Sequence, residues 1–293
     1  MISQFESPSL GGSVPSVFTW TGSAEMKLPM TAEVGRQEPQ AAAESPAPAS
    51  SVPLPTANPP LPAPEVLAQL AEHSRALEQA SPREIIAWAV EHYYPKLTMA
   101  TAFGPEGCVI IHYLAEIERR TPVFNLDTGY QFPETLALRE RIRERYGIEV
   151  EYKSAPSTVE EYEAQHGGPL YKSNPDKCCF DRKVTVLRQA AIGMRAWMSG
   201  IRRDQSPDRA AAPIVGWDKK FGLVKISPLA NWTKKDVWKL ITDENIPYNP
   251  LHDQGYTSIG CLPCTRAVMF GEDERAGRWS GTAKVECGLH TAD

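Results

Sequence analysis

The chain has 293 residues, 42% hydrophobic and 23% charged, a composition typical of one large or two small globular domains. Its formal net charge of -5 argues against binding nucleic acid or an anionic membrane through bulk electrostatics, so any anion site must be a local cluster. No run of eighteen apolar residues occurs, and the first residues lack a basic segment followed by an apolar one. These features predict a cytoplasmic protein with no signal peptide and no membrane span.

The first 62 residues differ in composition from the rest of the chain. Residues 39–64 contain nine prolines among many alanines and serines and almost no large apolar side chains. Such a segment cannot bury enough apolar surface to offset the entropy lost on ordering. Residues 1–62 are therefore predicted to be a disordered leader, and residues 63–293 to form the folded domain.

From residue 64 onward, helical and extended patterns alternate. Ser81, Pro82 and Glu84 predict the capped start of the second helix, and Thr233 predicts the cap of the last. Helices are predicted at 64–80, 81–94, 106–120, 133–147, 180–193 and 233–245, and strands at 97–103, 122–127, 148–154 and 196–201. Strands separated by helices of this length predict an α/β fold, a parallel sheet with helices on both faces.

Ligands of such sheets bind beyond the carboxyl ends of the strands, so the loops after the strands are the candidate site. Gly104, in the loop "TAFGPEG", allows close backbone approach to an anion, although a glycine turn there is equally expected for steric reasons. Asp127, in "LDTG", suits either a ribose contact or helix capping. The loop "GIRRDQSPDR" is more telling, because Arg202, Arg203 and Arg209 cluster at the predicted binding edge.

Six cysteines are present, and their spacing is informative. Cys108 lies on an apolar helix and is expected to be a core residue. The adjacent pair Cys178 and Cys179 is followed 82 positions later by the pair Cys261 and Cys264. In a chain without a secretion signal, clustered cysteines bind metal or react more often than they form disulfides. An iron–sulfur cluster, a zinc ion and unligated buried thiols all remain open, and the adjacent pair favours the cluster because it suits a tetrahedral zinc site poorly.

Five short motifs together resemble the assimilatory adenylyl-sulfate reductases of the phosphoadenylyl-sulfate reductase family. In chain order they are "KCCFDRKV", "GIRRDQSPDR", "GCLPCTRAV", "ERAGRW" and "ECGLH", and the resemblance runs from about residue 80 to the end. It implies a Rossmann-like, adenine nucleotide alpha hydrolase-type fold. It also implies thioredoxin-dependent reduction of adenosine 5′-phosphosulfate (APS) to sulfite and AMP, in sulfate assimilation and cysteine biosynthesis.

The resemblance also assigns roles to residues. Cys178, Cys179, Cys261 and Cys264 would bind a [4Fe–4S] cluster, which favours APS over its 3′-phosphorylated form, PAPS, because relatives that use PAPS generally lack these cysteines. Cys287 would attack the substrate sulfur and carry an S-sulfocysteine, from which thioredoxin or a glutaredoxin-like reductant releases sulfite. The candidate substrate-binding residues are Gly104, Asp127, Lys183, Arg202, Arg203, Arg275, Arg278 and His290.

The chemistry of Cys287 agrees with this role. A thiolate forms at neutral pH only near positive charge or a helix N-terminus, and Arg275, Arg278 and His290 are nearby in sequence. The arginines could instead pair with the acidic residues at 272–274, and His290 could be a plain surface residue. We expect the tail from about residue 280 to be mobile, because the same thiol must meet both the substrate and the reductant.

Some features depart from the family or leave alternatives open. The loop "TAFGPEG" lacks the serines of many relatives, so backbone contacts are expected to carry more of the nucleotide binding. The chain ends soon after His290, so the reductant is expected to be a separate protein, and a homo-oligomer remains possible. A PAPS reductase is one alternative. A zinc-stapled binding module would suit a basic protein, and an ATP pyrophosphatase-type enzyme would need an S-G-G-x-D-S loop that this chain lacks.

Overall fold

The computed structural model describes residues 59–282, 284 and 286–290. Except for residues 59–62, the leader expected at 1–62 lies outside the described residues. The same holds for positions 283, 285 and 291–293 of the tail that we expected to be mobile. The first described helix begins at Pro64, as the apolar pattern predicts.

A six-stranded sheet forms the centre of the described region, with strand order β3-β2-β1-β4-β6-β5. All neighbouring strands are parallel except β5, which pairs antiparallel with β6 at one edge. The strands are β1 (Leu97–Thr101), β2 (Val123–Asp127), β3 (Val150–Ser154), β4 (Ala196–Met198), β5 (Val215–Asp218) and β6 (Leu223–Ile226). The chain runs outward from β1 in one direction to β3, then returns to β4 on the other side. The carboxyl ends of β1 and β4 therefore flank the crevice in which ligands of doubly wound sheets bind.

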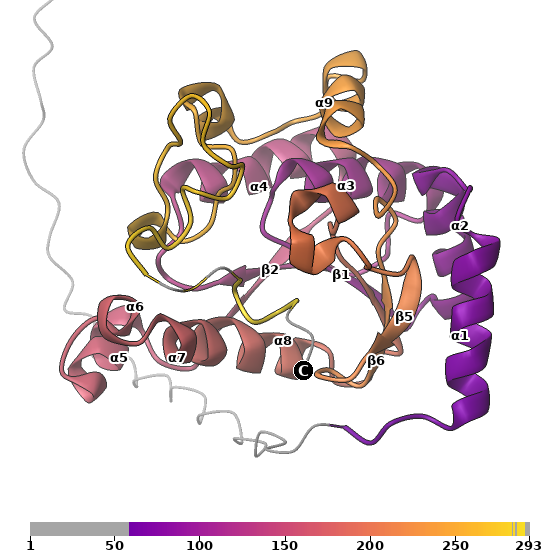
Figure 1. Cartoon of the computed structure of the whole chain (residues 1–293), viewed down its shortest axis with the longest axis horizontal. Helices are drawn as coiled ribbons and strands as arrows, with labels where there is room; N and C mark the ends of the chain where they lie inside the picture. The colour runs from indigo at the N-terminus through magenta and orange to yellow at the C-terminus, as the bar shows by residue number, and fades with distance from the viewer. Residues whose placement is uncertain (1–58, 283, 285, 291–293) are drawn as a thin grey trace, which may run out of the picture. The chain divides into compact units, whose positions relative to one another are not determined.

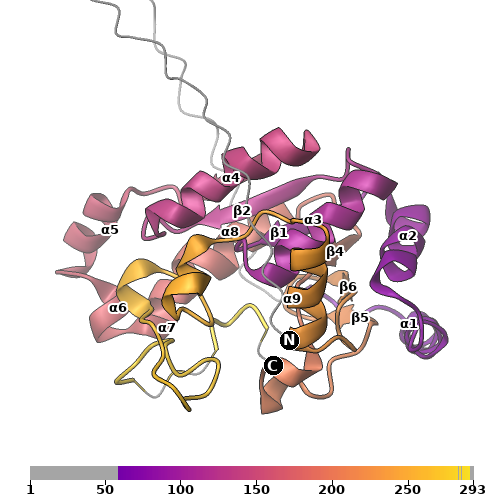
Figure 2. The same ribbon diagram turned by 90° about the horizontal axis from the view of Figure 1, so that it is seen from above.

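Helices cover both faces of this sheet (Figures 1 and 2). In Figure 1, α3, α4 and α9 lie above the strands, α5 to α8 lie below them, and α1 and α2 stand at the side of β5 and β6. Their bounds are α1 (Pro64–Ala76), α2 (Pro82–Tyr93), α3 (Pro105–Ile117), α4 (Pro133–Tyr146), α5 (Val159–His166), α6 (Leu170–Ser173), α7 (Pro175–Cys179), α8 (Thr185–Ala190) and α9 (Lys234–Asp243). The expected α/β sheet with helices on both faces is confirmed, and the antiparallel edge strand is the departure from a purely parallel sheet.

Local sequence signals explain several helix starts. Ser81 and Glu84 form a reciprocal capping box at the start of α2, and Thr233 forms one with Asp236 at the start of α9. Cys108 is fully buried on α3, as expected of a core residue. In the part of the chain that the structure describes, no helix is long and apolar enough to cross a membrane.

Candidate active-site cavity and cysteine cluster

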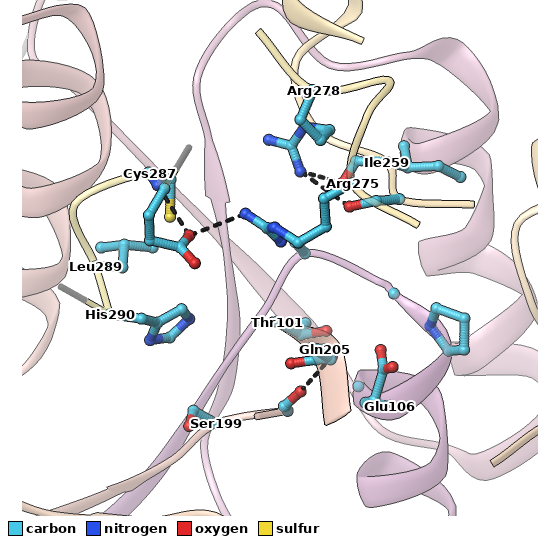
Figure 3. Close-up of a pocket in the computed structure, with 18 of the residues that line it drawn as sticks. Thr101, Glu106, Ser199, Gln205, Ile259, Arg275, Arg278, Cys287, Leu289 and His290 are labelled. Atoms are coloured by element: carbon cyan, nitrogen blue, oxygen red, sulfur yellow. Dashed lines mark hydrogen bonds and ion pairs between the residues drawn. The ribbon is translucent and has the colours of Figure 1, made fainter. Parts of the chain in front are cut away.

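A cavity of about 220 Å³ opens at the carboxyl ends of β1 and β4. Its walls come from the turn into α3, the loop after β4, and the chain from residue 252 to residue 290. Figure 3 shows Cys287 and His290 on one side of this cavity and Glu106 on the other. The sequence-predicted site residues that line it are Gly104, Lys183, Cys261, Arg275, Arg278, Cys287 and His290. Residues more than 180 positions apart in sequence therefore meet at the predicted edge of the sheet.

Five cationic side chains line the cavity, namely Lys183, Arg209, Lys234, Arg275 and Arg278. Arg278 lies close to the backbone at Gly260, where a side chain on residue 260 would collide with its guanidinium group. Its Nε is buried and has no partner among the described residues, so this N–H is available to a ligand. Such a wall suits an anion, because arginine donates charge-assisted hydrogen bonds to phosphate and sulfate oxygens.

The tail carrying Cys287 is docked against this cavity. The Lys220 ammonium donates to the carbonyl of Gly288 at 2.6 Å, and Leu289 packs against the apolar cluster around α8. The His290 ring is stacked 5.9 Å from the ring of Trp197, and its Nδ1 lies 3.2 Å from the Lys225 ammonium. Burial first, and then repulsion by Lys225, holds the pKa of His290 well below its usual value, so the ring is neutral at physiological pH.

Glu286, next to the thiol, joins this tail to the basic wall. Its carboxylate accepts hydrogen bonds from Arg209 at 2.6 and 3.1 Å and from Arg275 at 3.2 Å. The alternative that Arg275 pairs only with the acidic residues just before it is thus not what the structure shows. Arg209 belongs to the predicted basic loop, although it was not among the predicted substrate-binding residues.

Three of the predicted binding residues do not line the cavity. The Arg202 guanidinium is fully buried and contacts the carboxylates of Glu106, Asp204 and Glu274. Arg203 points away, toward Glu78 just after α1 and the carbonyl of Ala212. Asp127 caps a turn by accepting from the backbone N–H of Gly129 at 2.9 Å. Their side chains are occupied by protein contacts, which a pattern of residue types in a loop does not reveal.

Polar atoms that the sequence analysis did not single out also face the cavity. Ser199 Oγ, Gln131 Oε1 and His252 Nε2 are buried, line the cavity, and have no hydrogen-bond partner among the described residues. Burial lowers the pKa of His252, so its Nε2 is available as an acceptor. Buried polar groups normally have partners, so these three atoms indicate the place of a polar ligand. His252 lies in the segment "LHDQGY", Gln131 follows the loop "LDTG" and Ser199 lies in the predicted strand 196–201, so the sequence places two of these atoms near the predicted edge without assigning them a role.

The two cysteine pairs converge on a second, smaller cavity. All four sulfur-bearing residues line it, together with Lys183, which lines the larger cavity as well. Burial, and then the proximity of Cys179, Cys261 and Cys264, raises the pKa of Cys178 to about 12. None of the six cysteines forms a disulfide. Folding therefore gathers the four thiols beside the Cys287 cavity.

A local irregularity in the helix places Lys183 between the two cavities. Directly after Cys178 and Cys179, at the end of α7, residues 180–184 form a π-helical turn before α8 begins. The sequence predicts a regular helix over 180–193, and π-helical turns of this kind are frequent at functional sites. Burial alone would lower the pKa of Lys183, but Cys261, Cys179 and Cys287 attract its positive charge and raise the pKa above its usual value. The ammonium group is thus charged and close to both sets of thiols.

The donor set of the smaller cavity suits an iron–sulfur cluster. Four cysteine thiols line it, without a carboxylate or imidazole from any described residue, and Cys₄ is the usual ligand set of [4Fe–4S] clusters. Within residues 59–290 as described, no three His, Cys, Asp or Glu side chains converge as they would around a single metal ion. A cluster tolerates wider ligand spacing than a single ion does, because its own iron and sulfide atoms fill the centre.

A doubly wound α/β sheet with a cavity at its switch point is a nucleotide-binding type of fold. Arginines, lysine and a thiol line this cavity, so the site is suited to the reaction of a thiol with an anionic substrate. Residues 96–267 match the family model described as the phosphoadenosine phosphosulfate reductase domain. The chain belongs to this family. The resemblance inferred from the five motifs is therefore confirmed.

Similar proteins support the same assignment. The chain is 47% identical over 207 residues to the adenosine 5′-phosphosulfate reductase of Bacillus pumilus, covering 70% of this chain and 89% of that protein. It is 45% identical over 223 residues to the phosphoadenosine 5′-phosphosulfate reductase of Gloeobacter violaceus, covering 75% and 92%. The crystal structure of phosphoadenylyl-sulfate reductase from Candida auris, a phosphate complex, aligns with a TM-score of 0.61 at 29% identity and covers 72% of this chain and all of that one. The expected fold is confirmed by this likeness.

Proposed function

We propose that this protein is an adenylyl-sulfate reductase that converts APS to sulfite and AMP with electrons from thioredoxin. The observation that carries the proposal is the position of Cys287, on the wall of a cavity lined by Lys183, Arg209, Arg275 and Arg278. A nucleophilic thiol needs cations both to stabilise its thiolate and to bind a substrate with negative charge on phosphate and sulfate. Relatives at 44 to 47% identity carry the same activity in their names.

The first step transfers the sulfonate group to the enzyme. The Cys287 thiolate attacks the sulfate sulfur of APS, an S–S bond forms, and the bond from that sulfur to the bridging oxygen breaks. AMP leaves with the bridging oxygen and its electron pair, and the enzyme holds S-sulfocysteine. Negative charge grows on the phosphate as AMP departs, and the arginines and Lys183 of the basic wall stabilise it there.

The second step needs an external dithiol. One thiolate of reduced thioredoxin attacks the Cys287 sulfur, and sulfite leaves with the electron pair of the S–S bond. The mixed disulfide is then resolved by the second thioredoxin thiol, which returns Cys287 as a thiolate and leaves thioredoxin oxidised. The docked tail must detach for this encounter, because one closed site cannot serve both the nucleotide and a second protein. A dithiol-driven cycle of this kind suits the reducing cytoplasm.

Cys178, Cys179, Cys261 and Cys264 would hold a [4Fe–4S] cluster in the smaller cavity. When bound, it supplies a covalent cross-link between the two cysteine segments and need not change its redox state. Lys183 lines both cavities, so its ammonium would remain beside the substrate phosphosulfate. In this proposal, the positive charge of Lys183 couples the cluster site to the substrate site.

The far end of the larger cavity favours APS over PAPS. Glu106 and Glu274 line this end, and with Asp204 they make three carboxylates against the two cations Arg202 and Lys234. A 3′-phosphate placed there would meet net negative charge, whereas a free 3′-hydroxyl could donate to an acceptor such as His252 Nε2. The relative from Gloeobacter violaceus is named as a phosphoadenosine 5′-phosphosulfate reductase, so the assay also tests PAPS as the alternative substrate.

An anaerobic assay of sulfite release tests the function. The purified protein, reduced thioredoxin and either APS or PAPS are combined, and we expect sulfite from APS. Cys287→Ser should abolish sulfite release while leaving any visible iron–sulfur absorption unchanged, because the thiol and the four cluster cysteines are separate groups. Turnover by Cys287→Ser would refute the nucleophile, and sulfite from PAPS but not from APS would refute the substrate assignment.

A further inference from the structure

We infer that Glu286 is a positioning residue for the nucleophile, holding Cys287 over the cavity by bridging the tail to Arg209 and Arg275. This inference rests on the proposed function, because it concerns the same thiol. It goes beyond that proposal, since it assigns the placement of the thiol to a residue that is not itself a reactive group. It also links the docking of the tail to the cations that face the substrate.

The contacts of Glu286 connect three separate segments of the chain. One carboxylate oxygen accepts from Arg209 in the loop after β4, and the other accepts from Arg275 in the loop before the tail. The second oxygen also accepts from the backbone N–H of Cys287 at 2.9 Å. That last bond fixes the backbone of the nucleophile directly, because residues 286 and 287 are adjacent.

This bridge is sheltered from water. The Glu286 side chain is 6% exposed, that of Arg209 is 8% exposed and that of Arg275 is 16% exposed. A buried ion pair of this geometry is costly to break by removing one partner, since the remaining charge loses its compensation. The two arginines also lower the pKa of Glu286 despite its burial, so the carboxylate is ionised at neutral pH.

The partners of Glu286 are themselves held in place. Arg209 donates to the side-chain oxygen of Gln205, which accepts from the backbone N–H of Arg202 at 3.1 Å. The backbone N–H of Arg275 donates to the Asp273 carboxylate at 3.0 Å. The guanidinium groups therefore present a preformed receptor for one carboxylate, and the tail supplies that carboxylate beside the thiol.

The bridge also bears on substrate binding. Arg209 and Arg275 both line the cavity, so the carboxylate of Glu286 and the anionic group of a substrate face the same two guanidinium groups. Glu286 keeps these cations from repelling each other in the free enzyme. Removing its charge should therefore weaken the docking of the tail while leaving the affinity for the substrate anion unchanged or higher.

Two variants and a matched control test the inference. Glu286→Gln keeps the size of the side chain and removes its charge, and Glu286→Asp keeps the charge on a shorter stem. Glu272→Gln is the control, because Glu272 lies in the same region but pairs with Arg266 outside the cavity, at the surface. For each protein, kcat and KM for APS are measured with thioredoxin. The rate of Cys287 alkylation by a neutral reagent is followed by peptide mass mapping without substrate.

We expect Glu286→Gln to lower kcat about 100-fold, the scale of loss when a reacting group is misplaced by about 1 Å. KM should change little or fall, and Glu286→Asp should recover much of kcat. Loss of one charge-assisted contact should speed the alkylation of Cys287 by about tenfold or more. Glu272→Gln should match the wild-type protein in all three measurements.

Several results would overturn the inference. They are a kcat for Glu286→Gln within about twofold of wild type, an unchanged alkylation rate, or an equal loss in Glu272→Gln. A loss of kcat that Glu286→Asp does not rescue at all would also count against it. If the wild-type protein releases no sulfite from APS, the proposed function fails, and the alkylation rates still decide whether Glu286 docks the tail.

Discussion

Two arginines of one loop, seven positions apart, are used in opposite ways. Arg202 is fully buried, its guanidinium contacts three carboxylates, and it does not line the cavity. Arg209 lines the cavity and, among the described residues, contacts a single carboxylate, that of Glu286 on the tail. The first arginine holds the loop and the turn into α3 together, and the second presents its charge to the site. What separates the two roles is how many fixed carboxylates surround each guanidinium group.

The carboxylates of the two networks differ in the same way. Burial raises the pKa of Glu274, which shares its cations with Glu106 and Asp204. The pKa of Glu286 is lowered despite its burial, because Arg209 and Arg275 attract its charge. The Arg202 network is thus short of positive charge, whereas the Arg209 network has positive charge in excess. An incoming anion is favoured at the second network and disfavoured at the first.

The largest effect is expected from removing Arg209. Arg209→Gln should lower kcat/KM for APS by about 100-fold or more, because it removes a cavity cation and releases the tail at once, a loss of about 3 kcal/mol in transition-state stabilisation. Steady-state sulfite release measures this. The double variant Arg209→Gln, Glu286→Gln should lose little more than the single variants, since both substitutions break one bridge. Additive losses would show that the two residues act independently.

Removing Arg202 should act mainly on stability. Arg202 is fully buried, so Arg202→Gln takes the shared cation from the half-buried Glu106 and Glu274, and breaking a buried pair costs about 3–5 kcal/mol. For a domain of this size that corresponds to a Tm lower by about 10 °C. Thermal and urea unfolding of the full chain measure the change. An unchanged Tm would show that Arg202 is not the central ion of its network.

The sequence predicted the layers of the fold well, because long helices with apolar spacing and capped starts carry strong local signals. It missed β5 and β6, which have four residues each and form a tight antiparallel pair whose turn contains Gly222 in the left-handed region. Strands that short have too few residues for an alternating pattern to stand out. The π-helical turn after Cys179 was missed for a related reason, since a helical pattern does not encode one inserted residue.

For the site, the motifs predicted which segments meet but not which way each side chain points. Lys183, Arg275, Arg278 and His290 line the cavity, and their contact with the substrate stays a prediction of the motif resemblance. Arg202 and Arg203 turn to carboxylates supplied by distant segments, Glu274 and Glu78. Those partners lie 72 and 125 positions away, so no local pattern could indicate them. The unpartnered atoms of Ser199 and His252 likewise become visible only when the chain is folded.

The two networks should respond oppositely to acid. The pKa of Glu286 is depressed in the folded protein, so the stability it contributes is present above its unfolded pKa and is lost as the pH falls through its lower, folded pKa. The pKa of Glu274 is raised, so the cost of keeping it ionised is relieved as the pH falls through its folded pKa. Tm is measured from pH 7 down to about pH 3 for the wild-type protein, Glu286→Gln and Glu274→Gln, so that the range extends below the usual pKa of glutamate. The Tm of Glu286→Gln should lie below that of the wild-type protein at pH 7, and this difference should shrink on acidification. Any increase in Tm caused by Glu274→Gln should also disappear on acidification. A deficit of Glu286→Gln that does not change with pH would mean that its charge is not what stabilises the docked tail.

The smallest effect on catalysis is expected from Arg203, the neighbour of Arg202. Its guanidinium contacts Glu78 and Asn231 and donates to Ala212, all away from the cavity, and its side chain is 28% exposed. Arg203→Gln should therefore leave kcat/KM for APS within about twofold and lower the unfolding free energy by about 1 kcal/mol or less, as for a partly exposed ion pair. Sulfite assays and urea unfolding of the same preparation measure both. A fall in kcat/KM with an unchanged unfolding free energy would mean that Arg203 turns into the cavity when the nucleotide binds. The division of this loop into supporting and substrate-facing arginines would then hold only for the free protein.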